Sequence, residues 1–209
     1  MSLEQIYTDV VNGEMDAVEA GVIAALSEGM AADRILQEGL VAAMDQIGQL
    51  FEEGEIFVPE MLFAARAMQA GLKVLKPALA GSEVKSPGKV AIGTVQGDLH
   101  DIGKNLVIMM LEGAGFEVVD LGTDAPPERF VEAVRDGAQV IGMSALLTTT
   151  MSAMGRTLEA LQTAGVRERV KVVIGGAPVT DAFAKKIGAD AYAADASVAT
   201  RIVRQLIAA

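Results

Sequence analysis

A single histidine and a nearby aspartate are the residues of this sequence whose types and spacing most suggest chemistry. His100 is the only histidine among 209 residues, and Asp98 precedes it by two positions. A neutral imidazole binds a borderline transition metal through one ring nitrogen, and a carboxylate that accepts a hydrogen bond from the other nitrogen fixes the tautomer. In the alternative interpretation His100 caps a turn, and Asp98 and Asp101 are carboxylates at a helix N-terminus. The residues alone support both interpretations about equally.

Hydroxyl-bearing residues and glycines form further candidate ligand contacts. Ser144, Thr148 and Thr150 could donate hydrogen bonds to a polar ligand, or they could cap helices. Gly175 and Gly176 could allow the backbone to approach a ligand closely, although Gly-Gly after a strand is also an ordinary turn. The sequence has no Walker motif, and no Gly-x-Gly-x-x-Gly follows the first predicted strand, so a dinucleotide site has little support.

The composition excludes several kinds of site. With no cysteine, the chain has no disulfide, thiol nucleophile, thiolate zinc site or iron–sulfur cluster. One histidine cannot form a cage of several imidazoles. A metal bound by His100 must therefore arrive already largely coordinated, as in a macrocycle.

Charge and hydropathy exclude further classes of protein. The 17 Lys and Arg residues are outnumbered by 28 Asp and Glu residues, and the resulting net charge of −11 is unsuited to binding nucleic-acid phosphates. No apolar run approaches the ~18 residues of a membrane span, and the acidic, amphipathic N-terminus is unlike a signal peptide. We therefore expect a soluble, cytoplasmic protein that binds neither nucleic acid nor membranes.

The periodicity of apolar residues predicts an N-terminal helical bundle. Apolar residues recur at helical spacing, for example over five turns in the stretch Ile35–Phe51. Pro59 suits the first turn of a further helix, which we expect to end near Lys76. Four helices with short connections predict an antiparallel bundle over residues 1–80, and residues 81–88 have the small, polar, Pro- and Gly-containing composition of a linker.

From Lys89 onward, short β-rich runs alternate with helical stretches. The predicted strands are 89–95, 117–120, 140–144, 171–174 and 191–193. The predicted helices are 102–112, 127–135, 150–164, 180–187 and 197–207. Five strands, each followed by a helix, predict an α/β domain over residues 89–209, with a doubly wound, Rossmann-like, flavodoxin-like parallel sheet. Ligands bind such sheets beyond the carboxyl ends of the strands, where the candidate residues fall.

Three dispersed segments, taken in order, resemble the cobalamin-binding signature. They are Asp98-x-His100-x-x-Gly103, Ser144-x-Leu146 and Gly175-Gly176. The longer stretch GDLHDIGKN makes the match specific, and the helical half, where FVPE leads into ARAM, resembles the cap domain of methionine synthase and of corrinoid methyl-carrier proteins. The resemblance covers nearly the whole chain, whose size and layout are similar to the corrinoid subunits of methylamine, methanol and aryl methyl ether methyltransferase systems.

The resemblance implies a cobalamin, or a related corrinoid, as the cofactor. His100 would be the lower axial ligand of cobalt, and Asp98 would accept a hydrogen bond from its ring. Thr150, at a position where a family member carries serine, would complete this relay. The cofactor's nucleotide tail would lie in a slot lined by Ser144, Leu146, Thr148, Gly175 and Gly176. A valine at Gly176 would then lower cofactor occupancy more than fold stability.

The resemblance implies other cofactor contacts on both halves of the chain. In the α/β half they are Asp101, Ile102, Gly103, Tyr192 and Asp195. The bundle would cover the methyl-bearing face of the corrin, with Phe57, Met61 and Met68 as candidate contacts. Helix-spaced apolar residues of this kind are also typical of a bundle core.

The resemblance further implies a methyl carrier. The chain would carry a methyl group on cobalt from a substrate-specific methyltransferase to a second methyltransferase, which delivers it to tetrahydrofolate or a thiol. A reductive activating protein would be a further partner. Because the chain has no cysteine and no spare histidine for zinc, we expect a non-catalytic carrier, with both half-reactions catalysed by its partners. The alternatives are a cobalamin-binding sensor or regulator, an isomerase subunit, and a flavodoxin-like module without cobalamin.

Overall fold

The computed structural model describes residues 2–79 and 86–208. The chain divides into two compact units, one made of Met1–Lys85 with Glu112–Gly115 and the other of Ser86–Leu111 with Phe116–Ala209. Residues 81–85 of the predicted linker lie outside the described residues. None of the helices in the described ranges is both long enough and apolar enough to cross a membrane.

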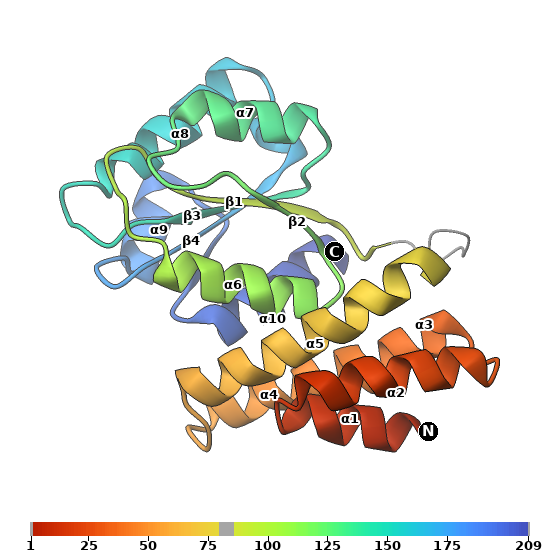
Figure 1. Cartoon of the computed structure of the whole chain (residues 1–209). Helices are drawn as coiled ribbons and strands as arrows, with labels where there is room; N and C mark the ends of the chain where they lie inside the picture. Colours follow the sequence, from red (N-terminus) through yellow and green to blue (C-terminus); the bar gives the residue numbers. More distant parts are fainter. Residues whose placement is uncertain (1, 80–85, 209) are drawn as a thin grey trace. The chain divides into compact units, whose positions relative to one another are not determined.

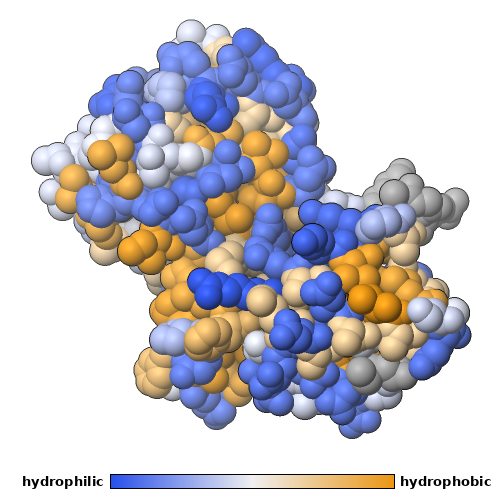
Figure 2. Space-filling model, in the orientation of Figure 1, coloured by the Kyte–Doolittle hydropathy of each residue, from blue (hydrophilic) through white to orange (hydrophobic). Residues whose placement is uncertain are grey.

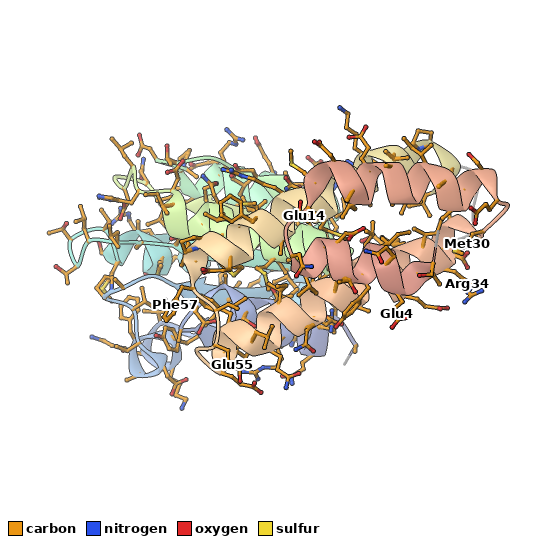
Figure 3. All side chains as sticks on the ribbon, turned by 60° about the horizontal axis from the view of Figure 1, so that its bottom comes forward. Glu4, Glu14, Met30, Arg34, Glu55 and Phe57 are labelled. Carbon is orange, nitrogen blue, oxygen red and sulfur yellow. The ribbon has the colours of Figure 1, made fainter. Side chains whose placement is uncertain are left out.

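The helical unit contains the four helical stretches that the apolar periodicity predicts. They are α1 (Leu3–Val11), α2 (Met15–Ser27), the continuous run of α3 (Ala32–Arg34), the π-helical η1 (Ile35–Val41) and α4 (Ala42–Glu52), and α5 (Val58–Leu79). The helix expected to end near Lys76 instead continues through Pro77. Pro77 lies in the last turn, where the missing proline N–H costs the helix only one hydrogen bond. Figure 3 shows Glu55 and Phe57 at the connection between α4 and α5, and Met30 at the other end of the bundle.

Close packing holds α2 and α5 together in this unit. Gly71 lies on α5, and a Cβ there would lie 2.8 Å from Val18 Cγ1 of α2 and 3.1 Å from Leu40 Cδ2 of η1. Val18 and Leu40 are fully buried. A side chain at Gly71 would push these elements apart, so the glycine is part of the bundle core.

The second unit is a parallel sheet in the order β2-β1-β3-β4-β5. Its strands are β1 (Lys89–Thr94), β2 (Glu117–Asp120), β3 (Val140–Ser144), β4 (Lys171–Gly175) and β5 (Ala191–Ala193). Its helices are α6 (Ile102–Gly113), α7 (Pro127–Arg135), α8 (Ser152–Thr163), the 3-10 turn η2 (Arg167–Arg169), α9 (Asp181–Ile187) and α10 (Ala196–Ala208). In Figure 1, α6 and α10 lie on one face of the sheet, and α7 and α8 lie on the other. The predicted doubly wound fold is confirmed.

The strand order reverses between β1 and β3, which is the position where doubly wound sheets bind ligands. Backbone hydrogen bonds connect the loops at this edge. The N–H of Val95, just beyond β1, donates to Ser144 O at 3.0 Å, and the N–H of Ala145 donates to Gly175 O at 3.2 Å. The carboxyl ends of β1, β3 and β4 therefore form one connected edge.

The start of α8 differs from the prediction. Thr150 was expected to begin this helix, but the helix begins at Ser152. The N–H of Thr150 donates to Leu147 O at 3.0 Å, and the N–H of Ala153 donates to Thr150 O at 2.9 Å, so the intervening residues form a turn. This turn leaves the Thr150 hydroxyl at the edge of the sheet.

Candidate functional site

A fully buried carboxylate lies at the centre of this edge. Asp98 has no exposed surface, and both of its oxygens accept hydrogen bonds. Oδ1 accepts from the backbone N–H of His100 at 3.0 Å and from its ring Nδ1 at 2.7 Å. Oδ2 accepts from the backbone N–H groups of Leu146 at 2.8 Å and Leu147 at 3.3 Å, and from Thr150 Oγ1 at 2.7 Å. These donors satisfy the buried charge from the loops after both β1 and β3.

The hydrogen bonds keep Asp98 ionised. Burial by itself raises the pKa of the Asp98 carboxyl, because it removes the charged form from water. The hydrogen bonds from the Thr150 hydroxyl, from the backbone and ring of His100 and from the Leu146 N–H outweigh burial, and they hold this pKa well below its ordinary value of 3.8. The site therefore carries a fixed negative charge beside the imidazole.

The His100 ring is held at one nitrogen and open at the other. Its side chain is 51 % exposed, although Asp98 beneath it is buried. Because an ionised carboxylate can only accept, Nδ1 is the protonated nitrogen and donates to Asp98. Within residues 2–79 and 86–208, Nε2 has no hydrogen-bond partner, so its lone pair is available to a ligand. A histidine held by a carboxylate in this way can bind a metal through its second ring nitrogen.

Exposed apolar side chains surround this pair. Leu99 is 73 % exposed and Ile102 is 79 % exposed on the His100 loop, and Leu146 and Leu147 on the facing loop are 44 % and 43 % exposed. In Figure 2, orange patches interrupt the blue surface beside the loops that follow β1 and β3. Large exposed apolar residues around a polar centre are typical of a surface that binds an apolar ligand.

The glycines of the site have different roles. A Cβ on Gly176, whose φ is +124°, would overlap the backbone of the loop after β3, at 1.9 Å from Ala145 O. A Cβ on Gly175 would lie 2.9 Å from Ala193 O. A Cβ on Gly103 would meet no described atom within 4 Å apart from its chain neighbours and the backbone of its own helix. Gly175 and Gly176 are required by the sheet edge itself, whereas Gly103 leaves open space beside His100.

The remaining α/β candidates lie at the same edge. Ser144 ends β3, and Thr148 is exposed in the turn before α8. Tyr192 is half-buried in β5. Two carboxylates bond within the chain, since Asp195 Oδ1 accepts the Val198 N–H at 2.8 Å and Asp101 Oδ2 accepts Asn105 Nδ2 at 3.1 Å. Asp195 therefore caps the N-terminus of α10, whereas Asp101 bonds to a side chain one turn further along α6.

The three candidates in the bundle differ in exposure. Phe57 is 67 % exposed at the connection that precedes α5 (Figure 3). Met61 and Met68 on α5 are 1 % and 0 % exposed. Their burial favours the role of core residues over that of contacts for a ligand, so Phe57 is the exposed one of these three candidates.

Two residues of the site were not anticipated from the sequence. The Thr94 hydroxyl donates to His100 O at 2.8 Å, and Asp124 Oδ1 accepts the N–H of Gly97 at 2.7 Å. Thr94 is the last residue of β1, and Asp124 lies in the loop after β2. Their contacts require β2 to pair with β1, which brings the carboxyl ends of these two strands side by side, and the residue types carry no signal of this pairing.

The residues at this edge fit a corrinoid. Among the described residues, no group of three or more His, Cys, Asp or Glu side chains could hold a metal ion. His100 instead offers one nitrogen, fixed in its tautomer, beside open space at Gly103 and exposed apolar residues. One axial nitrogen is what a cobalt already held by a macrocycle needs, and apolar side chains suit the macrocycle's face.

Comparison with known protein families decides the cofactor. Residues 88–201 and residues 2–76 each match a B12 binding domain family. The chain belongs to the B12-binding corrinoid protein family. Cobalamin or a related corrinoid is therefore the cofactor, and the predicted resemblance is confirmed.

Individual relatives match almost the whole chain. A dimethylamine corrinoid protein of Methanosarcina mazei is 46 % identical over 207 residues, covering 98 % of this chain and 95 % of the relative. The methanol:cobalamin methyltransferase complex MtaBC of Methanosarcina barkeri contains a chain that is 32 % identical, with a TM-score of 0.89, covering 99 % of this chain and 79 % of that one. A cobalamin-binding protein of Desulfitobacterium hafniense is also 32 % identical, with a TM-score of 0.80 and 98 % of both chains covered.

Proposed function

We propose that this corrinoid protein carries a methyl group on cobalt from an amine-specific methyltransferase to a second methyltransferase, which passes it to tetrahydrofolate or a thiol. The amine-specific donor is supported by the similarity to a dimethylamine corrinoid protein, which exceeds the similarity to the methanol complex. The comparisons do not favour the alternative of a cobalamin sensor. A reductive activating protein is a further expected partner.

The observation that carries this proposal is the hydrogen bond from His100 Nδ1 to Asp98, a fully buried carboxylate whose two oxygens both accept hydrogen bonds. In this proposal His100 Nε2 would be the atom that holds the cobalt of the corrinoid. When bound, the corrinoid supplies a cobalt that accepts and releases the methyl group. The protein's contribution would be to hold the His100 imidazole in one tautomer, with Nε2 available to the cobalt.

The charge of Asp98 sets the properties of His100 as a ligand. The carboxylate accepts the Nδ1 proton at 2.7 Å, and this makes Nε2 a better electron-pair donor. Because the pKa of Asp98 is held far below neutrality, the proton stays on Nδ1 rather than moving to the carboxylate. Thr150 and the N–H groups of Leu146 and Leu147 fix the carboxylate in place, so the ring cannot turn without breaking its hydrogen bond.

Reconstituted methyl transfer tests the function. The protein loaded with hydroxocobalamin and reduced would be mixed with a dimethylamine methyltransferase or with the methanol-specific enzyme, each with its substrate. Methylation of the bound cofactor, followed spectroscopically, is expected with the amine enzyme at a rate at least about tenfold above the methanol enzyme. Methylation by neither enzyme would contradict the proposed function, and faster methylation by the methanol enzyme would contradict the choice of donor.

A further inference from the structure

Two residues outside the His100–Asp98 pair, Thr94 and Asp124, hold the main chain on either side of Asp98. On one side, Thr94 Oγ1 donates to the backbone carbonyl of His100 at 2.8 Å. Thr94 is fully buried, and its own main chain is fixed in the sheet, where its N–H donates to Gly122 O at 2.9 Å. The Thr94 hydroxyl therefore connects the rigid end of β1 to the residue that carries the imidazole.

On the other side, two hydrogen bonds of Asp124 restrain the beginning of the loop after β1. Its Oδ1 accepts the N–H of Gly97 at 2.7 Å, and its own N–H donates to Asp98 O at 2.9 Å. Asp124 is also the only non-glycine residue with positive φ in the described ranges, at +50°. Residues other than glycine rarely adopt this backbone conformation, and it persists where the surroundings enforce it. Here the two hydrogen bonds to Gly97 and Asp98 supply the constraint.

These contacts complete the restraint of the imidazole. The Asp98 side chain is fixed by the loop after β3, and the ring is fixed to Asp98. The height of the ring above the sheet still depends on the main chain of residues 97–100. Thr94 and Asp124 restrain that main chain at its two ends, from β1 and from the loop after β2.

We propose that Thr94 and Asp124 are positioning residues that set the height and direction of His100 toward the cobalt. This inference rests on the proposed role of His100 as the lower ligand. A ligand placed about 1 Å too low binds more weakly without any change in its own chemistry. Loss of either restraint therefore shifts the bound corrinoid toward the form without histidine ligation, although the fold and the corrinoid remain in place.

Matched variants separate positioning from folding. Thr94→Val removes the hydroxyl at nearly constant shape, whereas Thr94→Ser retains it. Asp124→Gly removes the carboxylate and also relieves the positive φ, whereas Asp124→Asn keeps an acceptor oxygen and tolerates the same φ. His100→Ala defines the spectrum without histidine ligation. Each variant would be loaded with hydroxocobalamin and its melting temperature measured alongside the wild type.

The first readout is the ratio of histidine-ligated to unligated bound corrinoid, from the absorption spectrum. We expect this ratio to fall about fivefold in Thr94→Val and in Asp124→Gly, the factor for the loss of one hydrogen bond. Thr94→Ser and Asp124→Asn are expected to restore it. The second readout uses the protein without corrinoid: amide hydrogen exchange at Gly97 is expected to be about fivefold faster in Asp124→Gly than in Asp124→Asn.

The outcomes distinguish this inference from the proposed function. If His100→Ala loses the histidine-ligated spectrum while Thr94→Val and Asp124→Gly keep the wild-type ratio, the positioning role is wrong and the function stands. If Thr94→Ser loses as much ligation as Thr94→Val, in step with a lower melting temperature, the residues act on folding alone and the inference fails. A wild-type spectrum without histidine ligation would overturn the ligand assignment and this inference together.

Discussion

The loops after β1 and β4 both carry the motif residues of the family, but they are built in different ways. After β1, side chains determine the structure, since Asp98 alone accepts hydrogen bonds from two loops. After β4, the main chain determines it, because Gly176 lies where a Cβ would overlap Ala145 O. A motif residue can thus mark the chemistry of a site or only the backbone that supports it. Substitutions in the two loops should separate these roles.

The largest effect is expected from Gly176→Val. The new side chain would overlap a backbone carbonyl and would require a φ of +124°, which only glycine adopts readily. We expect the protein without corrinoid to lose about 4 kcal/mol or more of its free energy of unfolding, measured with urea. This reverses the expectation from the sequence that cofactor occupancy would fall more than stability.

Gly103→Ala is the matched control for that substitution. Gly103 lies in the other loop, and an added Cβ there meets open space among the described atoms. The unfolding free energy of the Gly103→Ala variant is expected to stay within about 1 kcal/mol of the wild type. Similar losses in the two glycine variants would remove the difference between the loops.

A smaller effect is expected from Asp98→Ala. This change leaves the partly buried N–H groups of Leu146 and Leu147 without their common acceptor, and it leaves the Thr150 hydroxyl with Leu147 O alone. We expect a loss of about 2–3 kcal/mol in the free energy of unfolding, together with loss of histidine ligation in the loaded protein. A variant as stable as the wild type would show that the carboxylate does not organise the two loops.

The smallest effect is expected from acid. The pKa of Asp98 in the folded protein lies below its ordinary value of 3.8, so the unfolded chain takes up this proton first. Its stabilising contribution is complete above that ordinary value and is lost as the pH falls through it toward the lower pKa of the folded state. Between pH 5 and pH 3, the unfolding free energy of the wild type is expected to fall more steeply than that of Asp98→Asn, by about 1 kcal/mol. Parallel pH profiles would contradict the depressed pKa.

Most of the fold could be predicted from the sequence because its signals are local. Central parallel strands are covered on both faces and are near-continuous apolar runs, and the predicted 140–144 matches the central β3. The predicted 117–120 and 191–193 match the edge strands β2 and β5. The π-helical η1 could not be predicted, since apolar spacing over seven residues does not distinguish it from an α-helix. The burial of Met61 and Met68 follows from tertiary packing, which helical spacing alone does not specify.

The site was only partly predictable for a related reason. His100 and Asp98 belong to a motif with a recognisable chemistry, the family resemblance adds Thr150, and the fold places both His100 and Thr150 within hydrogen-bond distance of Asp98. Thr94 is an ordinary strand residue in the sequence, and Asp124 follows a strand whose loop carries no motif. Their contacts depend on the pairing of β1 with β2 and on a positive φ, neither of which has a signal in the residue types.

The central claim is that the cobalt is bound by the chain's only histidine, and isotopic labelling tests it directly. The protein would be produced with ¹⁵N-histidine, loaded with unlabelled cobalamin and reduced to the paramagnetic cobalt state for electron spin resonance. A nitrogen ligand from His100 predicts that the triplet splitting seen in unlabelled protein becomes a doublet in labelled protein. A triplet that persists in the labelled protein would mean that the cofactor's own base is the ligand, and it would contradict the account.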